Sequence, residues 1–159
     1  MSTQSDNLLI IAASEVDSNI YYASGFLAPD DFIYLKTGGK SILLMSDLEV
    51  DRARLQSKVD EVLSYSDYQE KAKQNTDKPK YTDVISALLK ERGVSEMTVP
   101  GSFPLEMGDA LREAGYKLTI GKEPFFAERA IKTKEEVLAI RTTQIAVEEA
   151  VDDLFDLLR

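Results

Sequence analysis

Residues 32–45 read FIYLKTGGKSILLM. The two apolar runs of this stretch, Phe32–Leu35 and Ile42–Met45, flank the segment Thr37–Lys40 with its two adjacent glycines. Glycine accepts the positive φ that a tight turn requires, so the stretch predicts a β-hairpin. Paired glycines can also cradle a phosphate where a helix follows, but here a strand follows. We therefore expect a hairpin and no phosphate-binding loop.

The segments on either side of the hairpin are also patterned. Upstream, NLLIIAAS (residues 7–14) is a continuous apolar run of strand length, which is typical of a buried strand. Downstream, Ser46 and Glu49 have the spacing of a capping box and predict a short helix through Ser57. The polar residues 66–80 predict an exposed loop or a partly helical excursion.

Helices and strands alternate in the second half of the chain. Residues 81–92 place apolar side chains on one helical face, and Gly93 stands where a helix C-terminus is usually capped. Pro104 suits the first turn of a helix that we expect to run to Ala114, with Gly115 closing it. Strands are expected around these helices, at residues 60–65, 96–100 and 116–120.

This order of elements predicts the α/β class, with a mixed β-sheet and helices packed on its faces. We expect a compact domain over residues 1–127, followed by a linker and a long helix over residues 128–159. Ribonuclease H-like folds share the order, and their nucleases hold metal ions on clustered carboxylates. Such a site needs an acidic residue on the first strand, but Leu8–Ala13 has none and Glu15 lies beyond it. A nuclease is therefore disfavoured.

Composition excludes several classes of site. The chain has 159 residues and a formal net charge of −9, with no histidine and no cysteine. The acidic surplus disfavours nucleic acid as a partner, because binding to phosphates requires clustered Lys and Arg. Without His or Cys, the chain cannot build a Ser–His–Asp triad, a Cys–His dyad, a His-ligated zinc site or a disulfide. Chemistry within this chain would have to use carboxylates, Lys, Tyr or Ser.

The expected compartment is the cytoplasm. The sequence has no apolar run of about 18 residues that could span a membrane. The N-terminal residues MSTQSDN lack the basic flank and cleavage pattern of a signal peptide. We expect neither a membrane nor a nucleic acid among its partners.

Residues 15–31 contain the candidate contact residues. They are polar and then aromatic, with a turn expected at Gly25. The aromatic side chains of Tyr21, Tyr22 and Phe26 are either core or a ligand platform, and core is favoured. Asp30 and Asp31 are adjacent, so in an extended segment they point to opposite sides and cannot easily share one metal ion. They are either solvated carboxylates or part of a loop that reaches a partner subunit.

The chain closes with a long amphipathic helix. Thr133 and Glu136 form a capping box at its start. Its last turns are rich in Asp and Glu, where the helix dipole favours cations. We expect either a frayed terminal helix or one that docks on polypeptide absent from this sequence. The apolar stripe has a three-then-four spacing, interrupted by Gln144, and consists of Val137, Ile140, Val147, Val151, Leu154 and Leu158.

Two stretches resemble the creatinase, prolidase and aminopeptidase P family. SNIYYASGF (residues 18–26) is similar to the Asn-x-x-Tyr-x-x-Gly-Phe segment of its N-terminal domain, and the hairpin after it is similar too. Residues 129–136 resemble the junction Arg-x-x-Lys-(Ser/Thr)-x-x-Glu that leads into the catalytic domain. One departure is the absence of a helix before the first strand, where about seven polar residues stand. The matching residues are Asn19, Tyr22, Gly25, Phe26, Arg129, Lys132, Thr133 and Glu136.

The resemblance implies a ribonuclease H-like N-terminal domain with no catalytic residue and no metal ligand of its own. The implied whole protein is a Xaa-Pro metallopeptidase or a creatinase-like relative, with two divalent ions (Mn, Co or Zn) in a catalytic domain that would follow this chain. It further implies a homodimer that acts on peptides. The loop after Gly25-Phe26 would approach the neighbouring active site, with Phe26, Asp30 and Asp31 as candidate contacts.

Two other functions remain open at this stage. Some relatives of the family lack the metal ligands and bind proteins, and the charge of −9 would suit a basic partner. A free-standing ligand-binding α/β domain is the third possibility. The residues that follow Arg159 in the gene would separate the first two, because only a peptidase needs the metal-binding set.

Overall fold

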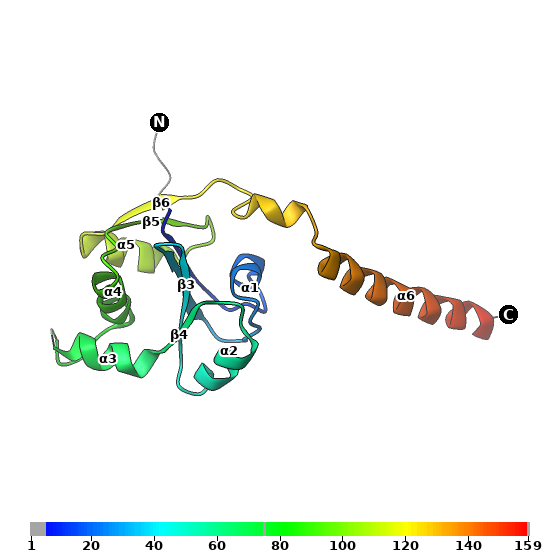
Figure 1. Cartoon of the computed structure of the whole chain (residues 1–159), viewed down its shortest axis with the longest axis horizontal. Coiled ribbons are helices and arrows are strands. Elements are labelled where there is room, and N and C mark those ends of the chain that lie inside the picture. Colours follow the sequence, from blue (N-terminus) through cyan, green and yellow to red (C-terminus); the bar gives the residue numbers. More distant parts are fainter. Residues whose placement is uncertain (1–5, 75, 159) are drawn as a thin grey trace. The chain divides into compact units, whose positions relative to one another are not determined.

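The structure is a computed structural model that describes residues 6–74 and 76–158 (Figure 1). The chain divides into two compact units, one up to Phe125 and one from Phe126 onward. We describe each unit by itself.

A six-stranded sheet in the order β4-β3-β2-β1-β5-β6 forms the centre of the first unit. β1 pairs antiparallel with β2 and parallel with β5, and β2–β3 is antiparallel. Both outer pairs, β3–β4 and β5–β6, are parallel. The predicted mixed sheet is therefore confirmed. Its strands are β1 Leu8–Ala12, β2 Phe32–Thr37, β3 Lys40–Met45, β4 Glu61–Ser64, β5 Glu96–Val99 and β6 Lys117–Ile120.

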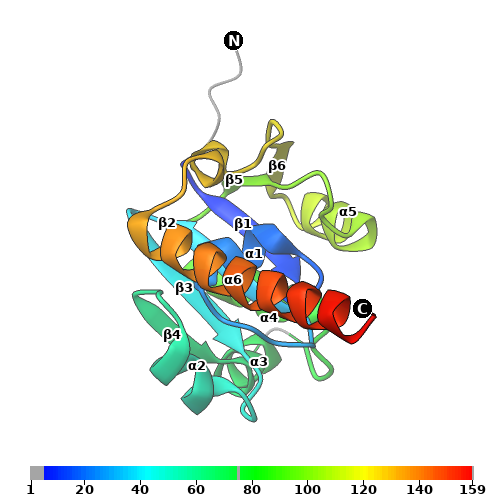
Figure 2. The ribbon, with the colours of Figure 1, turned by 90° about the vertical axis from the view of Figure 1, so that its right-hand side faces the viewer.

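The hairpin that the sequence predicted joins β2 to β3 (Figure 2). Thr37 pairs with Lys40, and Ile33 pairs with Leu44 at the far end of the ladder. The turn consists of Gly38 and Gly39, whose φ angles are 56° and 78°. These positive angles are the reason that the turn needs glycine.

Five helices cover the two faces of this sheet. Helices α3, α4 and α5 lie on one face, and α1 and α2 lie on the other (Figure 1). The two layers use alternate residues of the same strands, because successive side chains in a strand point to opposite faces. The helices are α1 Ser18–Ser24, α2 Val50–Gln56, α3 Tyr65–Lys73, α4 Tyr81–Glu91 and α5 Leu105–Glu113.

The main core lies between the sheet and helices α3 to α5. Leu9, Leu35 and Leu44 from the central strands belong to one cluster with Leu88 and Leu111 from the helices. The alternate strand residues Ile10, Tyr34 and Leu43 are buried too and face the α1–α2 layer. The sheet is thus buried on both sides, as its continuous apolar runs predicted.

Two features near α1 and α2 differ from expectation. The sequence pattern predicts no helix in residues 15–26, yet α1 forms there between Asp17 and Gly25. The prediction of a capping box at Ser46 and Glu49 is wrong, because α2 begins only at Val50 and Glu49 is its N-cap residue. Ser46 instead accepts the N–H groups of Glu49 and Val50 on its carbonyl.

The helices on the other face of the sheet lie closer to the positions that the sequence predicted. α3 covers the first half of the segment 66–80, predicted as a loop or a partial helix, and begins one residue earlier, at Tyr65. Ser64 caps it by accepting the N–H of Asp67. α4 ends before Gly93, whose φ is 65°, as predicted. Pro104 occupies the N-cap position of α5, one residue before the first turn where it was expected, and its carbonyl accepts the Gly108 N–H at 2.9 Å.

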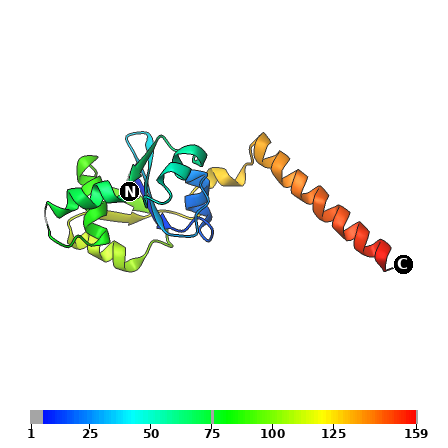
Figure 3. The ribbon, with the colours of Figure 1, turned by 90° about the horizontal axis from the view of Figure 1, so that it is seen from below.

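The second unit holds a short 3-10 helix, η1 (Ala127–Ala130), and the long helix α6 (Lys134–Leu157). Figure 3 shows α6 as one uninterrupted helix. The predicted capping box is confirmed: Thr133 Oγ1 accepts the N–H of Glu136, and the Glu136 carboxylate accepts the N–H of Thr133. α6 lies wholly within the described residues, and none of its side chains is buried.

Candidate functional site

The Gly-Phe loop, residues 25–31, follows α1 and contains the candidate contact residues. Asp17 starts α1 by accepting the N–H groups of Asn19 and Ile20 on one carboxylate oxygen, at 2.8 and 3.0 Å. Gly25 ends the helix with a φ of 63° and donates its N–H to the Tyr21 carbonyl at 2.7 Å. The residues before and after α1 therefore fix where the loop begins.

Gly25 also has a close neighbour. A Cβ atom at this position would lie 2.8 Å from Cγ of Lys58. The backbone N–H of Lys58 donates to the Ser24 carbonyl at 2.8 Å. This hydrogen bond keeps the Lys58 side chain next to the turn. Both the backbone angle and the contact require glycine at the start of the loop.

Phe26 anchors the loop in the core. Its side chain is fully buried, and its ring meets that of Phe32 edge to face at 6.0 Å between centroids. Ser24 Oγ accepts the Phe26 N–H at 3.1 Å, which fixes the backbone beside the ring. The centre of the Arg52 guanidinium lies 4.2 Å from the centroid of the Phe26 ring and closes the pocket from the α2 side.

The next two residues are held by their backbone. Arg52 donates from a terminal nitrogen to the Leu27 carbonyl at 2.9 Å. Ala28 donates its N–H to the buried Ser14 Oγ at 2.7 Å and accepts the Glu15 N–H at 3.3 Å. The base of the loop is thus tied to α2 and to the residues that follow β1, while Leu27 keeps 52% of its side chain exposed.

Asp30 and Asp31 are exposed at the end of the loop, immediately before β2. The ring of Tyr81 stacks on that of Tyr65, with centroids 5.6 Å apart. Burial raises the pKa of the Tyr81 hydroxyl, and the neighbouring Tyr65 and Asp31 raise it further. Asp31 therefore lies within electrostatic reach of this aromatic pair, at the end of the sheet where α3 and α4 begin.

The structure separates the three candidates that the sequence grouped. Asp30 and Asp31 are accessible, whereas Phe26 is inside and acts on the loop from below. Leu27, which the sequence analysis did not single out, is the exposed apolar side chain of the loop. Arg52 was missed as well, because no local pattern signals a contact with a loop 25 residues away.

The other motif residues lie in α1 and in the junction to α6. Asn19 lies in the first turn of α1, and Tyr22 lies one turn later with 37% of its side chain exposed. In the junction to α6, the Lys132 ammonium donates to the carbonyl of Arg129. Together with the capping box of Glu136, this contact fixes where α6 starts.

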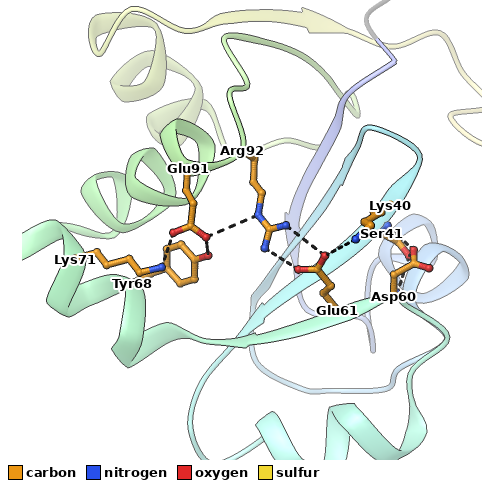
Figure 4. A network of polar contacts seen from close by, with 8 residues as sticks. All are labelled: Lys40, Ser41, Asp60, Glu61, Tyr68, Lys71, Glu91 and Arg92. Atoms are coloured by element: carbon orange, nitrogen blue, oxygen red, sulfur yellow. Dashed lines mark hydrogen bonds and ion pairs between the residues drawn. The ribbon is translucent and has the colours of Figure 1, made fainter.

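A network of charged side chains links β3, β4, α3 and the end of α4 (Figure 4). Glu61 on β4 accepts from Arg92 at 2.7 Å and from Lys40 at 3.3 Å. Glu91 accepts from the Tyr68 hydroxyl at 2.6 Å and pairs with Lys71. The Arg92 guanidinium lowers the pKa of Glu61, as Lys71 and Tyr68 lower that of Glu91. We interpret the network as a brace between β4, α3 and α4, because each of its two carboxylates, Glu61 and Glu91, is already paired with a cation.

Neither a metal cluster nor a membrane span is found in the part of the chain that the structure describes. Within residues 6–74 and 76–158, no three His, Cys, Asp or Glu residues gather in a way that could hold a metal ion. Over the same residues, no helix is both long and apolar enough to cross a bilayer.

Comparison with known proteins assigns the domain. The sequence profile of the creatinase/prolidase N-terminal domain matches residues 1–131. The chain belongs to this family. The match includes the whole of this creatinase/prolidase N-terminal domain and stops shortly before α6 begins. A comparison with curated protein sequences gave no match.

Solved structures with the same fold agree with the assignment. The prolidase from Pyrococcus furiosus is 20% identical over 92% of this chain and 37% of its own chain, with a TM-score of 0.65. The Xaa-Pro dipeptidase from Bacillus anthracis is 16% identical over 83% and 33%, also at 0.65. The X-Pro aminopeptidase from Thermotoga maritima is 14% identical over 83% and 34%, at 0.61. The creatinase/prolidase N-terminal domain described here thus spans 37% or less of these three relatives.

Proposed function

We propose that this chain is the non-catalytic N-terminal domain of a Xaa-Pro metallopeptidase, of the proline dipeptidase or aminopeptidase P type. Its roles would be dimerisation and control of substrate access. The observation that carries the proposal is the family match over residues 1–131, followed at once by the capped helix α6. The names of the similar structures, prolidase and X-Pro aminopeptidase, support the substrate class.

The helix α6 would be the first helix of a catalytic domain. Its apolar stripe is exposed in this structure: Val151 retains 45% of its accessible surface, the lowest value in the stripe, and Leu158 retains 73%. Contiguous apolar surface of this kind marks a contact with other polypeptide. In the proposed enzyme, two divalent ions, Mn, Co or Zn, would supply the hydrolytic chemistry from that catalytic domain.

The Gly-Phe loop would act at the entrance of a neighbouring active site. Asp30 and Asp31 offer exposed carboxylates that can accept hydrogen bonds from the free α-ammonium of a peptide. Phe26 would contribute indirectly, by holding the loop from the core together with Arg52. Leu27 adds the apolar surface that a contact with a partner subunit needs.

A protein-binding module is the second candidate. The net charge of −9 favours it, since an acidic surface suits a basic protein partner. In that case the downstream polypeptide would lack the metal ligands, and the Gly-Phe loop would have no substrate to meet.

The test uses the product of the full natural gene. Purified with added Mn²⁺, Co²⁺ or Zn²⁺, it should hydrolyse Xaa-Pro dipeptides or longer Xaa-Pro peptides. Residues 1–159 alone, under the same conditions, should show no turnover above the blank. An inactive full-length protein that captures basic proteins would support the binding module and overturn the peptidase.

A further inference from the structure

The two edge strands of the sheet, β4 and β6, differ in the apolar side chains that they expose. Native proteins shield exposed edge strands with charged side chains, because an open edge can pair with another chain. The β4 edge follows this rule through Glu61, which is held by Arg92 and Lys40. β6 forms the other edge of the sheet (Figures 1 and 2). It begins with the charged Lys117 but ends in Ile120, which is 64% exposed.

Backbone hydrogen bonds show which groups of β6 face outward. Lys117 donates its N–H to Ser95 at 2.9 Å, and Gly121 donates to Val99 at 2.8 Å, both toward β5. Successive residues of a strand alternate in direction, so Leu118 and Ile120 present their N–H and C=O groups to the free edge.

The same two residues point their side chains toward α5. Leu118 packs against the main core, and Ile120 shares its face. An apolar groove of about 190 Å³ lies there, lined by Leu118 and Ile120 together with Phe103 and Leu105 of the α5 region. Leu105 is 74% exposed, so an incoming strand would cover it as well as Ile120.

We propose that β6 pairs antiparallel with β6 of a second copy of this chain. The outward groups fix the register: Leu118 of one copy faces Ile120 of the other, with hydrogen bonds in both directions, and Thr119 faces Thr119 across the two-fold axis. The segment that fits this edge must carry apolar residues at alternate positions facing α5, and β6 itself has them in Leu118 and Ile120.

The charges are compatible with this pairing. Lys117 lies opposite Gly121 of the second copy, so no like charges face each other in the ladder. Lys117 is already paired with Glu96 of its own chain at 3.1 Å. Thr–Thr and aliphatic cross-strand pairs each stabilise an antiparallel ladder.

This inference rests on the dimerising role proposed above and names the surface that performs it. It does not depend on peptidase activity. The experiments below therefore distinguish loss of this interface from loss of the dimer altogether.

Cysteine crosslinking tests the register directly. The chain has no cysteine, so a disulfide in Thr119→Cys can form only between two copies. In the proposed dimer, the two copies of residue 119 face each other on the two-fold axis as a non-hydrogen-bonded pair. Their Cβ atoms are then close enough for a disulfide. Lys117→Cys is the matched control on the same strand, because its two copies would be about 13 Å apart along the ladder. Thr119→Cys should give a covalent dimer under mild oxidation, and Lys117→Cys should not.

A charge substitution gives a second readout. Ile120→Lys should move the sedimenting species of residues 1–159 from twice the chain mass toward one chain mass. Leu55→Lys, an equally drastic change at an 87% exposed position on α2, should not. A chain that is monomeric throughout would overturn both the dimerising role and this interface. A dimer that survives Ile120→Lys and does not crosslink through Thr119→Cys would overturn the interface alone.

Discussion

The guanidinium of Arg52 lies 4.2 Å from the ring centroid of Phe26 and donates to the carbonyl of the next residue, Leu27. One side chain of α2 thus covers the buried end of the Gly-Phe loop and holds its first exposed residue. Arg52 also donates from Nε to the carboxylate of Glu49, the N-cap residue of α2, at 2.7 Å.

Arg52→Ala should therefore destabilise residues 1–159 by about 1–2 kcal/mol, because it removes a cation–π contact and a charge-assisted hydrogen bond. Urea denaturation measures the free energy of unfolding. Arg54→Ala is the control on the same helix: Arg54 pairs with Asp51, which is 92% exposed, and its loss should cost about 0.5 kcal/mol or less. Equal effects of the two variants would contradict the role of Arg52.

Gly25→Ala should cost more than Gly93→Ala. Both glycines have φ near 65°, which costs an L-residue about 1–2 kcal/mol. Only at Gly25 would the new Cβ also meet Cγ of Lys58, at 2.8 Å, whereas the space around Gly93 is open to 4 Å. In a Lys58→Ala background, the cost of Gly25→Ala should fall to that of Gly93→Ala. A double-mutant cycle in thermal denaturation checks this, and strict additivity would refute the contact.

Local patterns predicted most of this fold. The glycines of the hairpin, the C-terminal glycine of α4 and the Thr133–Glu136 box each satisfy a need that arises within a few residues. The sequence did not predict helix α1, because its seven residues are mostly polar and aromatic and show no apolar helical period. Asp17 and Gly25 were the available signals, as its N-cap and C-terminal glycine.

Long-range contacts explain what the sequence could not predict. The spacing of Ser46 and Glu49 suggested a capping box, but the Glu49 side chain instead pairs with Arg52. Arg52 in turn is held by the distant carbonyl of Leu27. Similarly, nothing local decides that Phe26 turns inward and Leu27 outward. That choice depends on Phe32 and Arg52, which only the folded chain brings to the ring.

The brace around Glu61 predicts a stability that depends on pH. The Arg92 guanidinium lowers the folded-state pKa of Glu61 below the unfolded value of about 4.3. A lowered pKa means that the stabilisation is complete above the unfolded pKa and is lost as the pH falls through the folded one. Glu61→Gln should thus cost about 1 kcal/mol at pH 7 and progressively less below about pH 4.

Urea denaturation from pH 7 to pH 3 measures this convergence. Glu70→Gln is the control, since Glu70 pairs with Lys73 in a pair whose side chains are 69% and 46% exposed. Its effect should stay within about 0.5 kcal/mol at every pH. A constant difference between wild type and Glu61→Gln down to pH 3 would show that the ionised carboxylate is not the stabilising group.

The exposed carboxylates of the Gly-Phe loop give a prediction for the full-length enzyme. If Asp30 or Asp31 receives the α-ammonium of a peptide, the double variant Asp30→Asn, Asp31→Asn should lower kcat/KM for short free-amine substrates by about tenfold or more, the equivalent of one charge-assisted hydrogen bond. N-acetylated peptides carry no ammonium, so their kcat/KM should not change. Asp51→Asn, an exposed change on α2, should leave both substrates unaffected. Unchanged kinetics with free-amine peptides would show that the loop does not read the substrate's N-terminus.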